Sequence, residues 1–376
     1  MVIIFITADI EGNRILSHQL PIQPIFDIMK AQGYDCRWGQ WRSPWGKCPG
    51  VDSHDQVQCY VTGDVGIPSQ FRSKTFFHTH GLHPIEKGFV SGDLWYGYLA
   101  PGKWWYNIVN EYGEIIDQQF NNDRIPVTGW AKMDVLFKKT REEIISEYNL
   151  NLPYDKTVLY APTGNWDYAT SFDKSIEHIL NLFSRLPYNL IIKNAVYSSS
   201  FEKWDYFCKY MKNSPKHIQK IGPLIIQGTI EETRIPDITP LYKISDVLIT
   251  DGSSVAWEFI GTDKPSIQLT NMKDPATSLM EGPCNEYCQV ENKKGYRYDR
   301  SEYGRSLIIN DFEECKGCGG VIKSSLENLE QTINEAIENP DLYAKKRRTW
   351  AKLVNEYVDG KCAQRCVDAI KRIADI

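Results

Sequence analysis

The chain has 376 residues, 42% of them hydrophobic, which is long for one usual domain of ~100–200 residues and predicts two medium-sized domains. A formal net charge of −5 and a pI near 5.9 give no overall positive field, so nucleic acid is not the expected partner. No apolar run approaches the ~20 residues that span a bilayer, and the N-terminus lacks a basic stretch and a small-residue cleavage site. These features predict a cytoplasmic protein.

The first half alternates short β-branched or aromatic runs with longer amphipathic stretches. Strands are predicted at residues 2–8, 58–63, 75–80, 94–100 and 124–130. A helix that ends at Gly33, followed by a further short strand, fits a crossover between the first two. This alternation is typical of βα units around a mainly parallel sheet.

A second series of βα units follows a helix predicted over 134–150. The stretch after that helix contains Pro153 and has no helical periodicity, so the domain boundary is placed there. Strands are then predicted at 157–163, 188–194, 225–228, 246–252 and 265–269, with helices at 171–186, near 200–213 and at 253–262. The predicted fold is therefore α/β, with two Rossmann-like domains facing a cleft. They cover residues 1–150 and 151–350, and a C-terminal helix over 351–376 returns to the first domain.

The sharpest local pattern is "YKISDVLITDGSSVAWEFIGTDKPSIQL", residues 242–269. A predicted strand leads through Asp251 and Gly252 into a helix that opens on Ser253 and Ser254. The first turn of a helix has unpaired N–H groups and a positive dipole end, which hold anionic oxygens well. A phosphate site and a plain serine N-cap fit this pattern equally well.

Three histidines, at 78, 80 and 83, fall within six positions. An imidazole at the C-terminal end of a strand can act as a general base near neutral pH, and His80 has that place. Strict alternation puts His78 and His80 on one face, so a metal-hydrolase site is the alternative. Later strands offer no further histidine ligand, since His178 lies in a helix and His217 in a polar stretch. A structural role is therefore favoured for His78 and a loop position for His83.

Five motifs resemble, in the same order, those of the CDP-glycerol glycerophosphotransferases, the family of teichoic-acid primases and polymerases. They are "HGLHPIEKG" (80–88), "GWAKMDVL" (129–136), "VLYAPTGNWD" (158–167), the stretch 242–269 and "DGKCAQRCVDAI" (359–370). Their common order makes the resemblance more specific than any single motif.

The resemblance implies a GT-B-like fold with an N-terminal acceptor domain and a C-terminal domain for the donor nucleotide. The implied reaction moves glycerol phosphate, or another alditol phosphate, from a CDP-activated donor to a hydroxyl of a cell-surface glycan or lipid-linked acceptor and releases CMP. His80 becomes the candidate catalytic base. The candidate donor and phosphate ligands are Thr163, Lys193, Asp251, Gly252, Ser253, Ser254 and Glu258, with Gly81 and Lys132 as further cleft residues. Neither a metal nor a cofactor is implied.

The chain also departs from the family's pattern. The family has a second catalytic histidine after a lysine of the C-terminal domain, whereas here Lys193 is followed by Asn194, Ala195 and Val196. The arginine after "APT" and the tyrosine before the two serines are also missing. Three alternatives stay open: another CDP-alditol donor, a nucleotide-sugar glycosyltransferase or UDP-sugar epimerase on the same fold, and a non-catalytic nucleotide or glycan binding protein.

Three further features have two interpretations each. Cys284, Cys288, Cys315 and Cys318 form a C-x3-C and a C-x2-C pair, which fits either a structural zinc or four independent thiols. The basic run 343–354 around Trp350 fits either peripheral contact with an anionic membrane or a solvated helix face. The aromatic stretch 94–109 fits contact with the acceptor or the membrane, or packing inside the first domain. The first interpretation of the basic run would place the protein at the inner face of the cell membrane.

Overall fold

The structure is a computed structural model. It describes residues 2–7, 19–40, 51, 53–63, 69–82, 95–115, 121–162, 171–193, 202–221, 224–226, 229–232, 237–251, 253–269, 289–291, 297–299 and 320–376. The chain forms two compact units. Unit 1 comprises Met1–Lys138, Asn285–Tyr303 and Lys352–Ile376, and unit 2 comprises Lys139–Cys284 and Gly304–Ala351.

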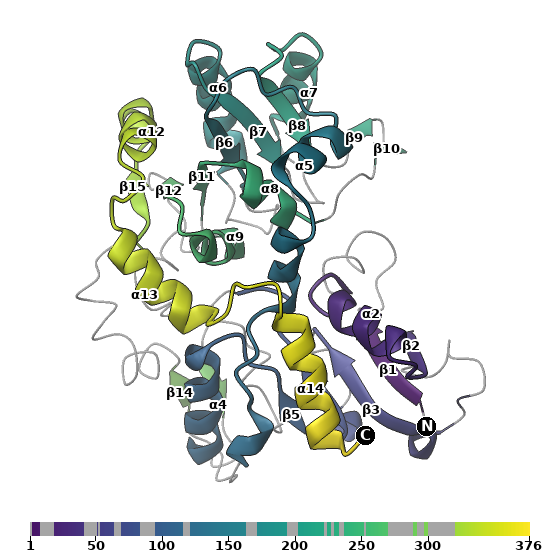
Figure 1. Ribbon diagram of the computed structural model, residues 1–376. Coiled ribbons are helices and arrows are strands. Elements are labelled where there is room, and N and C mark those ends of the chain that lie inside the picture. Colours follow the sequence, from purple (N-terminus) through teal and green to yellow (C-terminus); the bar gives the residue numbers. More distant parts are fainter. Residues whose placement is uncertain are drawn as a thin grey trace. The chain divides into compact units, whose positions relative to one another are not determined.

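Unit 1 is built on a parallel sheet with the strand order β2-β1-β3-β4-β5 (Figure 1). The strands are β1 (Val2–Thr7), β2 (Cys36–Gln40), β3 (Val57–Thr62), β4 (Thr75–Phe77) and β5 (Gly97–Tyr98). Every residue of β1 is buried, as expected for a central strand covered on both faces. The order reverses between β1 and β3, and ligands of such sheets bind at the carboxyl ends of strands near that point.

The helices of unit 1 are α2 (Gln23–Ala31), α3 (Ser69–Arg72), α4 (Lys103–Ile115) and α14 (Cys362–Ala374), with 3₁₀ turns at His54–Gln56, Asn122–Arg124 and Ala131–Phe137. A hairpin of β13 (Gln289–Glu291) and β14 (Arg297–Asp299) also belongs to this unit. Residues of α2 and α14 share one hydrophobic core with β1, including Phe26, Met29, Cys366 and Ile370.

A single buried carboxylate fixes the start of α14. The oxygens of Asp134 accept hydrogen bonds from the backbone N–H groups of Cys362 at 3.0 Å and Ala363 at 2.7 Å. These donors belong to the first turn of the helix, where no partner within the helix exists. Burial raises the pKa of Asp134 although both bonds oppose that shift. Asp134 therefore caps a helix more than 200 residues further along the chain.

Unit 2 contains a six-stranded parallel sheet with the order β15-β12-β11-β6-β7-β8. Its strands are β6 (Thr157–Tyr160), β7 (Asn189–Lys193), β8 (Ile218–Ile221), β11 (Val247–Thr250), β12 (Ser266–Leu269) and β15 (Ile322–Ser324). Numbered along this unit alone, the order is the doubly wound 3-2-1-4-5-6, with its reversal between β6 and β11. A short antiparallel pair, β9 (Leu224–Ile226) and β10 (Thr229–Glu232), accompanies it.

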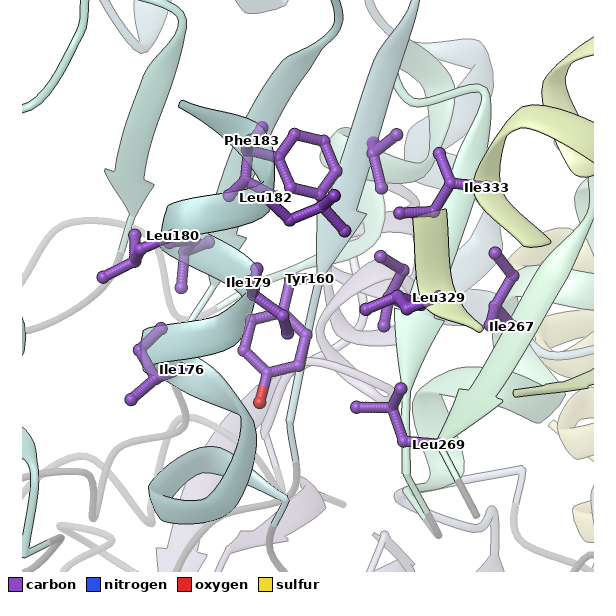
Figure 2. Close-up of a cluster of buried hydrophobic side chains, with 14 of the residues drawn as sticks. Tyr160, Ile176, Ile179, Leu180, Leu182, Phe183, Ile267, Leu269, Leu329 and Ile333 are labelled. Atoms are coloured by element: carbon purple, nitrogen blue, oxygen red, sulfur yellow. The ribbon is translucent and has the colours of Figure 1, made fainter. Parts of the chain in front are cut away.

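The helices of unit 2 are α5 (Arg141–Glu147), α6 (Phe172–Phe183), α7 (Trp204–Met211), α8 (Thr239–Ile244), α9 (Ser254–Phe259) and α12 (Leu329–Glu338), and α13 (Ala344–Val354) begins in it. Figure 2 shows the apolar side chains of α6 and of α12 beside those of the sheet. Ile176, Ile179, Leu180 and Phe183 recur at helical spacing, which is why this side of α6 enters the core.

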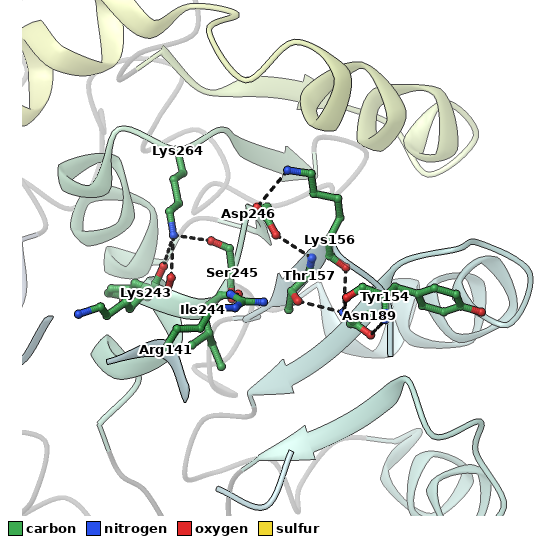
Figure 3. A network of polar contacts seen from close by, with 11 residues as sticks. Arg141, Tyr154, Lys156, Thr157, Asn189, Lys243, Ile244, Ser245, Asp246 and Lys264 are labelled. Atoms are coloured by element: carbon green, nitrogen blue, oxygen red, sulfur yellow. Dashed lines mark hydrogen bonds and ion pairs between the residues drawn. The ribbon is translucent and has the colours of Figure 1, made fainter. Parts of the chain in front are cut away.

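Cations from elsewhere in unit 2 satisfy the last carbonyl groups of α8 (Figure 3). Nζ of Lys264 donates to the carbonyl oxygens of Tyr242, Lys243 and Ser245 at 2.9, 3.0 and 2.7 Å. Arg141 donates to the carbonyl of Ile244. Positive charge is favourable at this end of a helix because the dipole is negative there. Burial lowers the pKa of Lys264 to about 8.

Several predicted elements differ from the observed ones. The helix predicted over 134–150 is a 3₁₀ turn at Ala131–Phe137 followed by α5, because Thr140 starts a new helix with a capping box to Glu143. The strand predicted over 124–130 is reduced to one bridge between Val127 and Ala100. The predicted strand 75–80 already ends at Phe77 in β4. The helix α4 was not predicted.

Candidate functional site

The loop after β4 is held by hydrogen bonds from both of its described histidines. Nε2 of His78 accepts the backbone N–H of Ala131 at 3.2 Å, so Nδ1 carries the proton that is donated to the carbonyl of Leu99 at 2.9 Å. His78 is fully buried, which lowers its pKa to about 4. Both ring nitrogens are hydrogen-bonded to backbone groups, so His78 is a neutral structural residue and not a metal ligand.

His80 is half-buried, at the end of the same loop. Its Nδ1 lies 3.0 Å from the carbonyl oxygen of Gly63, the residue after β3. A carbonyl can only accept, so this contact requires the proton on Nδ1 and, in the neutral ring, puts the lone pair on Nε2. Nε2 is thus the atom that can accept a proton, as a general base requires. Gly81 is buried next to it, and its N–H donates to Thr79 Oγ1 at 3.4 Å.

Lys132 lies close to this loop through Trp130. Its Nζ is 5.0 Å from the centre of the Trp130 ring, a cation–π distance. The indole Nε1 of Trp130 donates to the carbonyl oxygen of Thr79 at 2.9 Å. The "GWAKMD" motif and the "HTHG" motif, separate in sequence, therefore meet in unit 1. Sequence reasoning missed Trp130, and its only signal was a bulky aromatic side chain directly beside a candidate lysine.

In unit 2 the expected donor residues lie at the carboxyl ends of β7 and β11. Lys193 is the last residue of β7 and is 6% exposed. Asp251 follows β11, is fully buried, and accepts a hydrogen bond from the N–H of Ser171 at 2.8 Å. Its carboxylate therefore anchors the residue that precedes α6. The end of β11 borders the reversal of strand order, at which such sheets bind ligands, and β7 is separated from it by β6 alone.

The two serines are at the start of α9. Oγ of Ser253, the N-cap residue, accepts the N–H of Val255 at 3.4 Å. Oγ of Ser254 donates to Oε1 of Glu258 at 3.4 Å, and Oε2 of Glu258 accepts the hydroxyl of Tyr242 at 2.7 Å. Glu258 is only 3% exposed, so its carboxylate lies inside unit 2 and not on its surface. Tyr242, fully buried, was not predicted.

Some predicted site residues lie outside the described residues. These are Thr163, Gly252, His83, the stretch 194–196 that replaces the family's second histidine, and the four cysteines of the candidate zinc site. Within the described parts of the chain, no cluster of three or more histidine, cysteine or acidic residues could hold a metal ion.

The basic run on α13 has a buried side. Trp350 is 1% exposed and packs against Trp257, with 5.6 Å between the ring centres. Arg347 is fully buried and donates to backbone carbonyls, among them that of Asp263 at 3.1 Å. The aromatic stretch also packs inside its unit, since Trp95, Tyr98, Trp104 and Trp105 are all buried. None of the helices in the described residues has the length and apolarity to cross a membrane.

Comparison with known families and proteins tests the resemblance that the sequence motifs indicate. Residues 100–274 match the family model described as CDP-glycerol:poly(glycerophosphate) glycerophosphotransferase. The resemblance to the glycerophosphotransferases is confirmed. The glycerophosphotransferase match includes Lys132, Lys193, Asp251 and both serines, while His80 lies upstream of it.

Two curated relatives carry related names. The chain is 32% identical over 158 residues to a teichoic acid poly(glycerol phosphate) polymerase of Bacillus subtilis, covering 40% of this chain and 19% of that protein. It is 24% identical over 292 residues to a teichoic acid glycerol-phosphate transferase of Staphylococcus aureus, covering 73% of this chain and 62% of that protein. The chain therefore spans less than two thirds of either relative.

Solved structures confirm the fold. The wall teichoic acid polymerase TagF matches 100% of this chain and 89% of its own with a TM-score of 0.60 and 16% identity. A UDP-GlcNAc 2-epimerase from Neisseria meningitidis matches 99% of this chain and 100% of its own with a TM-score of 0.57 and 12% identity. The α/β architecture with two parallel sheets is thus the GT-B-like fold that the sequence predicted.

Proposed function

We propose that the protein transfers glycerol phosphate, or another alditol phosphate, from a CDP-activated donor to a hydroxyl of a cell-surface glycan or lipid-linked acceptor. The hydroxyl oxygen forms a bond to the phosphorus next to the alditol, the bond from that phosphorus to CMP breaks, and CMP leaves with the electron pair. The family match over residues 100–274 supports this reaction class. The observation that carries the mechanism is the bond between His80 Nδ1 and Gly63, because it leaves the lone pair on Nε2.

His80 is assigned to the acceptor, whose hydroxyl proton passes to Nε2 as the new bond to phosphorus forms. A positioned base of this kind contributes ~10²–10⁴-fold to the rate. Gly81 and Lys132 are assigned to the same side, since Gly81 follows His80 in the loop and Lys132 lies over the ring of Trp130, which is hydrogen-bonded to Thr79. Lys132 would place positive charge near the reacting phosphoryl group, where negative charge must be stabilised.

Unit 2 is assigned to the donor. Lys193, Ser253 and Ser254, with Thr163 and Gly252 beside them in the sequence motifs, are proposed to hold its phosphates. Lys193, Ser253 and Ser254 are at the carboxyl ends of β7 and β11. Asp251 and Glu258 are proposed to hold this end of the unit 2 sheet in place through buried hydrogen bonds. Their carboxylates accept these bonds from Ser171 and Tyr242.

Peripheral contact with the inner face of the membrane is the remaining proposal from the sequence. Lys345, Arg348 and Lys352 of α13 are exposed, whereas Trp350 is buried. Contact through this helix would therefore be electrostatic and not by insertion, with ~1 kcal/mol per cation near an anionic surface. Binding to vesicles with and without anionic lipid, at low and high salt, tests it, and binding that ignores lipid charge and salt would exclude it.

The reaction is tested by calorimetric binding of CDP-glycerol, CDP-ribitol, CMP, UDP and UDP-N-acetylglucosamine, followed by an assay of CMP release. Cytidine-selective binding and CMP release from one of the CDP-alditols are expected. Selective binding of uridine nucleotides would replace the proposal by nucleotide-sugar chemistry on the same fold. Binding of none of these nucleotides would indicate a non-catalytic protein.

A further inference from the structure

We propose that Trp130 is a positioning residue for His80, an inference that rests on the proposed role of His80 as the base. The indole N–H of Trp130 donates to the carbonyl oxygen of Thr79 at 2.9 Å. That oxygen belongs to the peptide group that joins Thr79 to His80. Holding it fixes the plane of this peptide group and therefore the direction in which the His80 side chain leaves the backbone.

His80 is thus held both at its backbone and at its ring. The Trp130 bond fixes the backbone, and the bond from Nδ1 to the Gly63 carbonyl at 3.0 Å fixes the ring. The ring bond forms only if the backbone places Nδ1 at the right distance from Gly63. Trp130 thereby determines both the orientation of the imidazole and the nitrogen that carries its proton. A catalytic base that is already oriented towards its substrate raises the reaction rate, because the base need not reorganise in the transition state.

Trp130 is itself held firmly. Its side chain is fully buried, and its backbone N–H donates to Oδ1 of Asn355 at 2.9 Å. Asn355 is 3% exposed and lies in the segment before α14, in the same unit. Hydrogen bonds therefore link the C-terminal segment at Asn355 to Trp130, and Trp130 to the loop at Thr79. The base is fixed by a residue far away in sequence, which is why no local motif indicated it.

The chain offers a matched control. Trp105 is also fully buried in unit 1, and its Nε1 also donates to a backbone carbonyl, that of Val354, at 3.0 Å. Trp105→Phe also removes an indole N–H donor from a fully buried ring, but it leaves the hydrogen bond to the Thr79 carbonyl intact. If the loss of a buried indole N–H only lowers stability, Trp130→Phe and Trp105→Phe should behave alike.

The first measurement is the tautomer of His80 by ¹⁵N NMR of the full chain, assigned with His80→Gln. Wild type and Trp105→Phe should show the proton on Nδ1, and Trp130→Phe should show a substantial fraction on Nε2. Equal tautomer fractions in the two Trp→Phe variants would overturn the proposal. This measurement needs no donor, so it decides the positioning role even if the protein does not act on CDP-alditols.

The second measurement is the rate of CMP release from the CDP-alditol that wild type uses. Trp130→Phe should lower kcat about tenfold or more with KM for the donor unchanged, since a small displacement of a catalytic group has a large effect. A change in KM alone would contradict the proposal. Asn355→Ala, which frees the Trp130 backbone and leaves the indole intact, should shift the tautomer in the same direction and covers the case that Trp130→Phe does not fold. An unshifted tautomer in Asn355→Ala would count against the role.

Discussion

Nδ1 of His80 donates to the carbonyl oxygen of Gly63 at 3.0 Å, and this bond joins the segments that follow two neighbouring parallel strands, β4 and β3. Two elements adjacent in the sheet thus set which nitrogen of the imidazole can accept a proton. The same loop contains His78, whose environment leaves neither ring nitrogen available for proton transfer. It is buried and bonded at both nitrogens, so it stays neutral and does no acid–base work near pH 7.

His80→Gln should lower CMP release about 10²–10⁴-fold because the proton acceptor is lost. The free energy of unfolding should change by about 1 kcal/mol, since the half-buried side chain loses its hydrogen bond to the carbonyl of Gly63. His178→Gln, on the exposed side of α6, is the control and should retain full activity. An active His80→Gln enzyme would remove His80 from the mechanism.

His78 should make unit 1 sensitive to acid. Its folded pKa is about 4 against 6.5 for an ordinary histidine. Between these values the unfolded chain binds a proton that the folded protein does not, so stability falls as the pH drops from 6.5 towards 4. The expected loss is about 2 kcal/mol between pH 7 and pH 5. Urea unfolding at both pH values measures it, and His78→Gln should be less stable at pH 7 but show a smaller loss. An equal loss in the variant would contradict the assignment.

Gly129→Ala should destabilise unit 1 strongly. Gly129 has φ +76°, and an added Cβ would lie 2.5 Å from Sγ of Cys362 and 3.0 Å from the carbonyl oxygen of Tyr357. Strain and clash together should cost about 3 kcal/mol or more. Gly33→Ala separates the two effects, because Gly33 has φ +90° with nothing within 4 Å of the added Cβ, and about 1–2 kcal/mol is expected there. Denaturant midpoints of both variants give the comparison, and equal costs would show that the clash is absent.

Lys264→Met should destabilise unit 2 by about 2–3 kcal/mol. The variant leaves three carbonyl oxygens at the end of α8 without their charged donor, whereas the apolar stem is kept. Lys174→Met, at an exposed position of α6, removes the same charge without this network and should have little effect. Thermal or urea unfolding followed by a signal from unit 2 distinguishes them. A Lys264→Met protein as stable as Lys174→Met would show that these bonds contribute nothing.

Ser253→Ala tests whether the serine holds the donor or only caps α9. Loss of the cap should cost about 0.5–2 kcal/mol of stability. If Ser253 contacts a donor phosphate, cytidine nucleotide binding should also weaken about tenfold. Thr140→Ala removes a comparable cap, that of α5, where Thr140 Oγ1 accepts the N–H of Glu143 at 3.2 Å. Calorimetry should show unchanged binding for Thr140→Ala, and unchanged binding for Ser253→Ala as well would leave Ser253 as a cap alone.

The sequence by itself determined the alternation of strands and helices, the order of the family motifs and the place of His80 after a strand. These features are local, because a strand or a cap is specified by residues within a few positions of each other. The same local patterns gave wrong boundaries at 124–130 and 134–150. There a bridge to Ala100 and the capping box of Thr140 decided the structure.

Only the tertiary structure decided what the remaining polar residues do. Asp134 caps α14, His78 joins two backbone segments, and Trp130 holds the peptide before His80. Trp350, at a position that a sequence can assign equally to a membrane surface or a core, packs on Trp257. In each case the partner lies far away in the chain, and a buried polar or aromatic group is defined by the partner that replaces water. That partner is chosen when distant elements pack, so a pattern within one element does not contain it.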